Sequence, residues 1–69
     1  MNEFGARIRS LRIKNEMTQW QVAFYLHIDR TTYSGYESGK RFPDAHTLCK
    51  IADLFNVSTD FLLNHNVKP

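Results

Sequence analysis

Residues 18–39, TQWQVAFYLHIDRTTYSGYESG, contain two short helical patterns with only a brief turn between them. Thr18 is a suitable N-cap for the first pattern, and Gln21 three residues later completes a capping box. Apolar residues then recur at helical spacing, at Val22, Ala23 and Leu26. Asp29 is a suitable N-cap for the second pattern. Gly39 follows its last residue, where helices often end in left-handed backbone.

Two helices joined by so short a turn must cross at a steep angle, as in a helix-turn-helix. Tyr33, Tyr36 and Glu37 share one face of the second helix. The opposite face is small, polar and free of acid, and it consists of Thr31, Ser34, Gly35 and Ser38, with Arg30 at its tip. The sequence therefore predicts that this second face points to solvent.

The bulk composition limits the class of protein. Sixty-nine residues form one small domain, and a single cysteine excludes an internal disulfide, so packing must supply the stability. No signal peptide is visible, and no apolar run approaches the roughly 18 residues of a membrane span. We therefore expect a cytoplasmic protein with no membrane partner. A net charge of +2 is weak evidence for nucleic acid, and charge alone favours an ordinary solvated surface.

The sequence on either side of residues 18–39 predicts three more helices. One runs to about Lys14, and another follows the N-cap Asp44 with an apolar stripe that we expect to be buried, at Ala45, Leu48, Ile51, Ala52 and Phe55. A short last helix follows the N-cap Ser58. The predicted fold class is all-α, a compact five-helix bundle over residues 1–64, with residues 65–69 as a tail.

No catalytic or metal site can be assembled from this sequence. His46, Cys49 and Asp53 share a helix face, but no second cluster completes a coordination shell. We therefore expect no metal, no cofactor and no enzymatic activity.

The second helix of the motif has the residue types of a DNA reader. An arginine near the start of a helix in the major groove, here Arg30, can bond both O6 and N7 of guanine. Thr31, Ser34 and Gly35 complete the predicted base contacts. Lys40 and Arg41, just after the helix, are placed to bind phosphates without reading sequence.

The combined pattern resembles the Cro/C1-type (Xre family) helix-turn-helix domain, over about residues 3–63. The residues that carry the resemblance are Gln19, Ala23, Ile28, Tyr36, Glu37, Gly39, Lys40 and Pro43. It implies a lambda-repressor-like fold and a transcriptional regulator that binds operator DNA as a homodimer, most often as a repressor.

The resemblance also implies roles for individual residues. Arg12 would form an ion pair with Glu37, and Gln19 would touch the DNA backbone. The full set of predicted backbone contacts is Thr18, Gln19, Thr32, Ser38, Lys40 and Arg41. The candidate dimer interface consists of Phe42, Leu54, Phe61 and Leu63, which could instead be partly buried within one protomer.

Two positions depart from the family pattern. Trp20 stands where a small or polar residue is usual, and it could contact a partner protein, contact the DNA backbone or pack against the first helix. His27 stands where glycine is usual, in a turn that tends to need positive φ. Trp20, Phe42 and the low net charge keep a second function class open, a protein-interaction module of the antitoxin or adaptor kind with the same fold.

Overall fold

The computed structural model describes residues 3–64, which form five α-helices. The helices are α1 (Glu3–Lys14), α2 (Gln19–Leu26), α3 (Arg30–Ser38), α4 (Ala45–Phe55) and α5 (Thr59–Leu63). This confirms the predicted all-α five-helix fold. The predicted tail, residues 65–69, lies outside the described residues. None of the helices in the described part of the chain is long and apolar enough to span a lipid bilayer.

Capping side chains fix where four of the helices begin. Thr18 and Gln21 form both hydrogen bonds of the capping box at α2. The other three caps each accept a hydrogen bond from a backbone N–H in the first turn of their helix, and they are Asp29, Asp44 and Ser58. Each cap satisfies a donor that the helix itself leaves without a partner. The local sequence therefore determines the short connections, and these force the helices to cross.

Each helix contributes one fully buried side chain to a single core. These side chains are Ile8, Val22, Tyr33, Ile51 and Leu62. One prediction for α4 is wrong, because Ala45 is exposed while Ile51, Ala52 and Phe55 are buried. Ala45 lies in the first turn, before the helix reaches the core.

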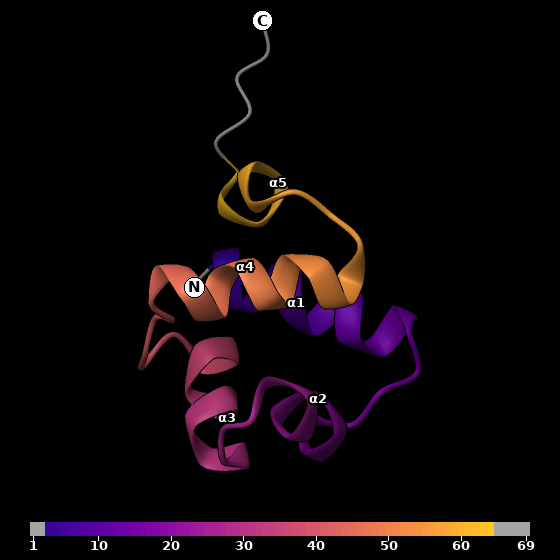
Figure 1. The fold of residues 1–69 in the computed structure, drawn as a ribbon, viewed down its shortest axis with the longest axis vertical. Coiled ribbons are helices and arrows are strands. Elements are labelled where there is room, and N and C mark those ends of the chain that lie inside the picture. Colours follow the sequence, from indigo (N-terminus) through magenta and orange to yellow (C-terminus); the bar gives the residue numbers. More distant parts are fainter. Residues whose placement is uncertain (1–2, 65–69) are drawn as a thin grey trace, which may run out of the picture.

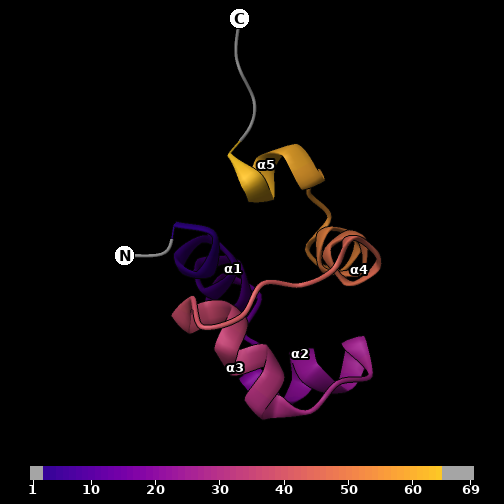
Figure 2. The same ribbon diagram turned by 90° about the vertical axis from the view of Figure 1, so that its left-hand side faces the viewer.

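The packing places α2 and α3 together at one end of the molecule. Helix α3 packs against both α1 and α2. In Figures 1 and 2, α5 lies at the opposite end, with α1 and α4 between it and the α2–α3 pair. Gly5 allows α1 to approach α3, because a Cβ at this position would lie 2.2 Å from the backbone oxygen of Glu37.

Candidate nucleic-acid interface

The turn between α2 and α3 uses left-handed backbone at a residue that has a side chain. His27 has φ 60° and ψ 40°, and its N–H caps the end of α2. The positive φ expected at this position is therefore present, although a histidine occupies it. Asp29 then begins α3. Hydrogen bonds from Thr32 hold the pKa of Asp29 below its usual value, so this carboxylate is already engaged in capping.

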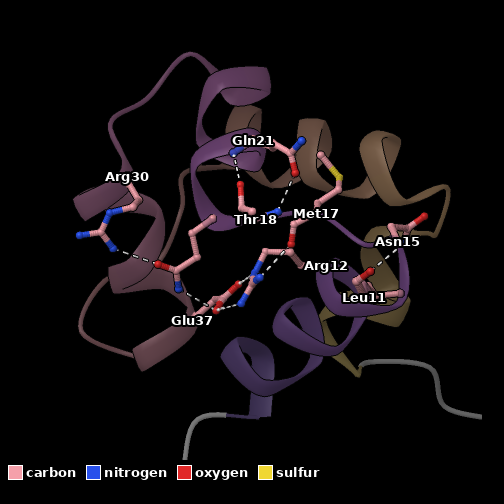
Figure 3. Close-up of polar contacts among 9 residues, drawn as sticks. Leu11, Arg12, Asn15, Met17, Thr18, Gln21, Arg30 and Glu37 are labelled. Carbon is pink, nitrogen blue, oxygen red and sulfur yellow. Dashed lines mark hydrogen bonds and ion pairs between the residues drawn. The ribbon is translucent and has the colours of Figure 1, made fainter.

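An ion pair with largely buried side chains joins α1 to the end of α3. Arg12 donates from Nε to Oε2 of Glu37 at 2.7 Å and from Nη2 to Oε1 at 3.2 Å. Its Nη1 donates to the backbone oxygen of Met17 at 2.9 Å, so the same side chain also fixes the chain before α2. Figure 3 shows the guanidinium pointing at the Glu37 carboxylate. The ion pair implied by the family resemblance is thus formed here.

The protonation of this pair follows from burial and hydrogen bonding. Burial pushes the pKa of Glu37 upward, but the hydrogen bonds from Arg12 and Gln19 outweigh burial and hold it below its usual value. The hydrogen bond with Glu37 raises the pKa of Arg12. Burial, and then the nearby Glu37 carboxylate, raises the pKa of Tyr33. Near neutral pH the pair is therefore charged beside a neutral phenol.

Gln19 connects this ion pair to the start of α3. Its Nε2 donates to Oε1 of Glu37 at 3.0 Å, and its Oε1 accepts from Nη1 of Arg30 at 3.0 Å. A chain of side-chain hydrogen bonds therefore runs Arg12–Glu37–Gln19–Arg30. It uses residues of α1, α2 and both ends of α3, and it holds Arg30 at the tip of the predicted reading helix (Figure 3).

Trp20 makes a contact that sequence reasoning missed. The guanidinium carbon of Arg30 lies over the indole ring, 5.3 Å from the ring centroid. The tryptophan is 69% exposed, which argues against the alternative that it packs against α1. The two residues are ten positions apart, and only the crossing of α2 and α3 brings them together, so no local pattern could have indicated this contact.

Most of the residues predicted to contact DNA are accessible to solvent. Thr31, Ser38, Lys40 and Arg41 are exposed, as is Thr18, while Gln19, Arg30, Thr32 and Ser34 are partly exposed.

Gly35 differs from the expectation of an open position facing the groove. It is buried, and a Cβ there would meet Cδ of Arg41 at 3.0 Å. The backbone N–H groups of Gly39 and Arg41 both donate to the Gly35 oxygen, which folds the loop back over the helix. Gly35 therefore makes room for the Arg41 side chain, and this accounts for the glycine without a close approach of DNA.

The candidate dimer residues have different environments. Phe42 is exposed, although its ring packs against Phe4 with centroids 4.8 Å apart. Phe61 and Leu63 of α5 are also exposed. Leu54 is partly buried against the core, so it has less surface to offer a partner.

Known proteins resemble this chain in both sequence and structure. A family model described as a helix-turn-helix domain matches residues 5–66. The SPbeta prophage-derived uncharacterized HTH-type transcriptional regulator YonR of Bacillus subtilis is 43% identical over 60 residues, which are 87% of this chain and 56% of YonR. The chain spans about half the length of the curated relatives it matches.

Two solved structures share the fold. The P22 c2 repressor, crystallised with a synthetic operator, superposes with a TM-score of 0.87 at 23% identity and covers 96% of this chain and 100% of its own. The restriction-modification controller protein C.AhdI of Aeromonas hydrophila has a TM-score of 0.80 at 30% identity, covering 87% of this chain and 91% of its own. Together with the matched residues 5–66, these similarities show that the chain belongs to the helix-turn-helix family of the Cro/C1 (Xre) type.

Proposed function

We propose that the protein is a cytoplasmic, sequence-specific regulator of transcription, most simply a repressor, which binds double-stranded DNA and has no catalytic role. Helix α3 enters the major groove, and a homodimer places two copies on half-sites about 34 Å apart. The observation that carries this proposal is the position of Arg30. Its guanidinium is held at the tip of an accessible helix by Gln19, while Lys40 and Arg41 lie exposed just beyond the other end of that helix. The similarity to YonR, which is named as an HTH-type transcriptional regulator, agrees with it.

The cationic side chains around α3 recognise different parts of DNA. Arg30 can form two hydrogen bonds to one guanine, which discriminates by about 1–3 kcal/mol against other bases. Lys40 and Arg41 are exposed and can meet phosphates, which every sequence presents. Gln19 lies in the first turn of α2, where helix N–H groups also favour a phosphate.

Selection of bound sequences from random duplex DNA tests the proposal. The protein should enrich one site, with affinity that falls steeply as salt rises. On that site Arg30→Ala should relax the preference at one base pair, whereas Lys40→Ala should weaken all sequences alike. Equal losses on every sequence from both substitutions would show that these roles are wrongly assigned.

A second function is favoured by one observation, the exposure of Trp20 and Phe24 on α2, at 69% and 83%. Aromatic side chains of this kind are common at protein interfaces. A protein-interaction module would retain the fold, show no DNA binding even at low salt and co-purify with a protein partner. The selection experiment and its salt dependence therefore separate the two functions.

A further inference from the structure

Trp20 and Gln19 contact two different parts of the same guanidinium. The Arg30 group lies over the Trp20 ring at 5.3 Å, and one of its edges donates to Gln19 at 3.0 Å. Within residues 3–64 the ion pairs are Arg12–Glu37 and Glu3–Arg7, so no carboxylate in the described part of the chain neutralises Arg30. Its charge stays available for a ligand.

We propose that Trp20 is a positioning residue that fixes the plane of the Arg30 guanidinium for guanine recognition. This inference rests on the proposed function, because it assumes that Arg30 reads a base. Trp20 would raise specificity without contacting the base itself. It also gives a role to an aromatic residue at a position where the rest of the motif does not require one.

The contacts of Arg30 leave N–H donors of its planar guanidinium available for a base. A guanidinium has five N–H donors in one plane, and only Nη1 is engaged by Gln19. The Trp20 ring centroid lies 5.3 Å from the guanidinium carbon, and the N–H groups that Gln19 does not engage can form the two in-plane hydrogen bonds that guanine O6 and N7 require. The ring contact and the hydrogen bond to Gln19 together restrict rotation about the bonds of the long arginine side chain. The side chain then loses less freedom when DNA binds.

Two other roles for the exposed Trp20 make different predictions. A tryptophan that touched the DNA backbone would contribute to affinity for all sequences, with or without Arg30. A tryptophan that bound a partner protein would not affect DNA recognition at all. Only a residue that acts through Arg30 loses its effect on DNA binding when Arg30 is removed.

A double-mutant cycle on the selected site distinguishes these roles. Trp20→Leu keeps an apolar side chain but removes the aromatic ring. Trp20→Phe keeps an aromatic ring that is smaller than the indole. Phe24→Leu is the matched control, since Phe24 is an exposed aromatic on the same helix. For each variant we measure the affinity for the selected site and for the same site altered at the base pair whose preference depends on Arg30. Thermal unfolding checks that each one folds.

Trp20→Leu should lower the discrimination at that base pair by roughly two- to fivefold, the range for an exposed cation–π contact. Trp20→Phe should lie between Trp20→Leu and wild type, and Phe24→Leu should match wild type. Adding Trp20→Leu to Arg30→Ala should cause no further loss. In the free protein, NMR relaxation of the Arg30 Nε–H group should show greater mobility in Trp20→Leu.

Unchanged discrimination in Trp20→Leu would overturn the inference and leave the proposed function intact, provided that Arg30→Ala still relaxes the base preference. A further, additive loss in the double variant would also overturn it, because Trp20 would then contact DNA directly. Failure of the wild-type protein to select any sequence would instead reject the proposed function. The inference would fall with it, whatever the relaxation data show.

Discussion

Glu37 combines nearly complete burial with a full negative charge. Its side chain is 5% exposed and that of Arg12 is 13% exposed, so each charge depends on the other for compensation. Breaking a buried pair from one side leaves an uncompensated charge, whereas replacing both partners with apolar groups is often tolerated. Arg12→Met should therefore lower the free energy of unfolding by about 3 kcal/mol.

The double variant Arg12→Met with Glu37→Met is the matched control for this prediction. It should recover part of the lost stability, because no charge then remains buried. Urea unfolding followed by circular dichroism measures wild type, Arg12→Met, Glu37→Met and the double variant. Simple addition of the two single losses in the double variant would mean that the pair is not energetically coupled.

The contribution of Glu37 to stability should depend on pH. Its folded-state pKa is lowered, so the stabilisation is present above the unfolded-state value of about 4.3 and is lost as pH falls through the folded-state pKa. In Arg12→Met the main cause of lowering is gone, and burial should raise the Glu37 pKa instead. The gap in unfolding free energy between wild type and Arg12→Met should therefore shrink as pH falls below about 5. The capping carboxylates Asp29 and Asp44 titrate alike in both proteins, so they cancel in this difference. A gap that is constant from neutral pH to pH 3 would contradict the assigned pKa shift.

At the scale of elements, the contact between α1 and α3 depends on a missing side chain. A Cβ on Gly5 would lie 2.2 Å from the Glu37 oxygen and 2.7 Å from the Tyr36 oxygen, and these are backbone atoms that cannot move without displacing α3. Gly5→Ala should lower the free energy of unfolding by roughly 3 kcal/mol, at the upper end of overpacking costs.

Gly35→Ala is the matched control because it adds the same methyl group within a helix. The three atoms nearest to its Cβ would all belong to the Arg41 side chain, at 3.0, 3.1 and 3.4 Å. The gain in helix propensity, about 1 kcal/mol, should offset the displacement of Arg41. Thermal unfolding should therefore show a large loss for Gly5→Ala and little change for Gly35→Ala. Similar melting temperatures for the two variants would show that α1 and α3 are not held at this distance.

The elements were predictable because their signals are local. The caps Thr18, Asp29, Asp44 and Ser58 were all identified from the sequence, and they mark where four helices begin. The Arg12–Glu37 pair was implied by family resemblance, since no local pattern links residues 25 positions apart.

The contacts that were missed depend on how the elements cross. Arg30 reaches Trp20 only through the angle between α2 and α3, and Arg41 covers Gly35 only because the loop turns back over α3. Helical periodicity gives the face of a residue but not which side chain from another element will lie on it. The exposed Ala45 shows the same limit, because periodicity does not say where along α4 the core begins.

For the molecule as a whole, the position of α5 allows dimerisation to be tested separately from DNA contact. Helix α5 lies at the opposite end of the molecule from α2 and α3 (Figure 1). Phe61 and Leu63 are exposed there, and a charge at either one is remote from Arg30. If the protein binds as a homodimer through α5, Leu63→Glu should shift it to a monomer in analytical ultracentrifugation. Affinity for a site with two half-sites should then fall on the order of 100-fold, because linkage between the two binding events is lost.

Affinity for an isolated half-site should be unchanged in Leu63→Glu, since every predicted DNA contact remains. Cys49→Glu is the matched control, as it adds the same charge at an exposed position on α4 outside the candidate interface. That variant should dimerise and bind like wild type apart from a small electrostatic penalty. If Leu63→Glu lowered the affinity for the half-site as much as the affinity for the full site, α5 would be needed for the fold or for the DNA-binding surface itself. The homodimer would be rejected if the wild-type protein sedimented as a monomer and bound each half-site independently.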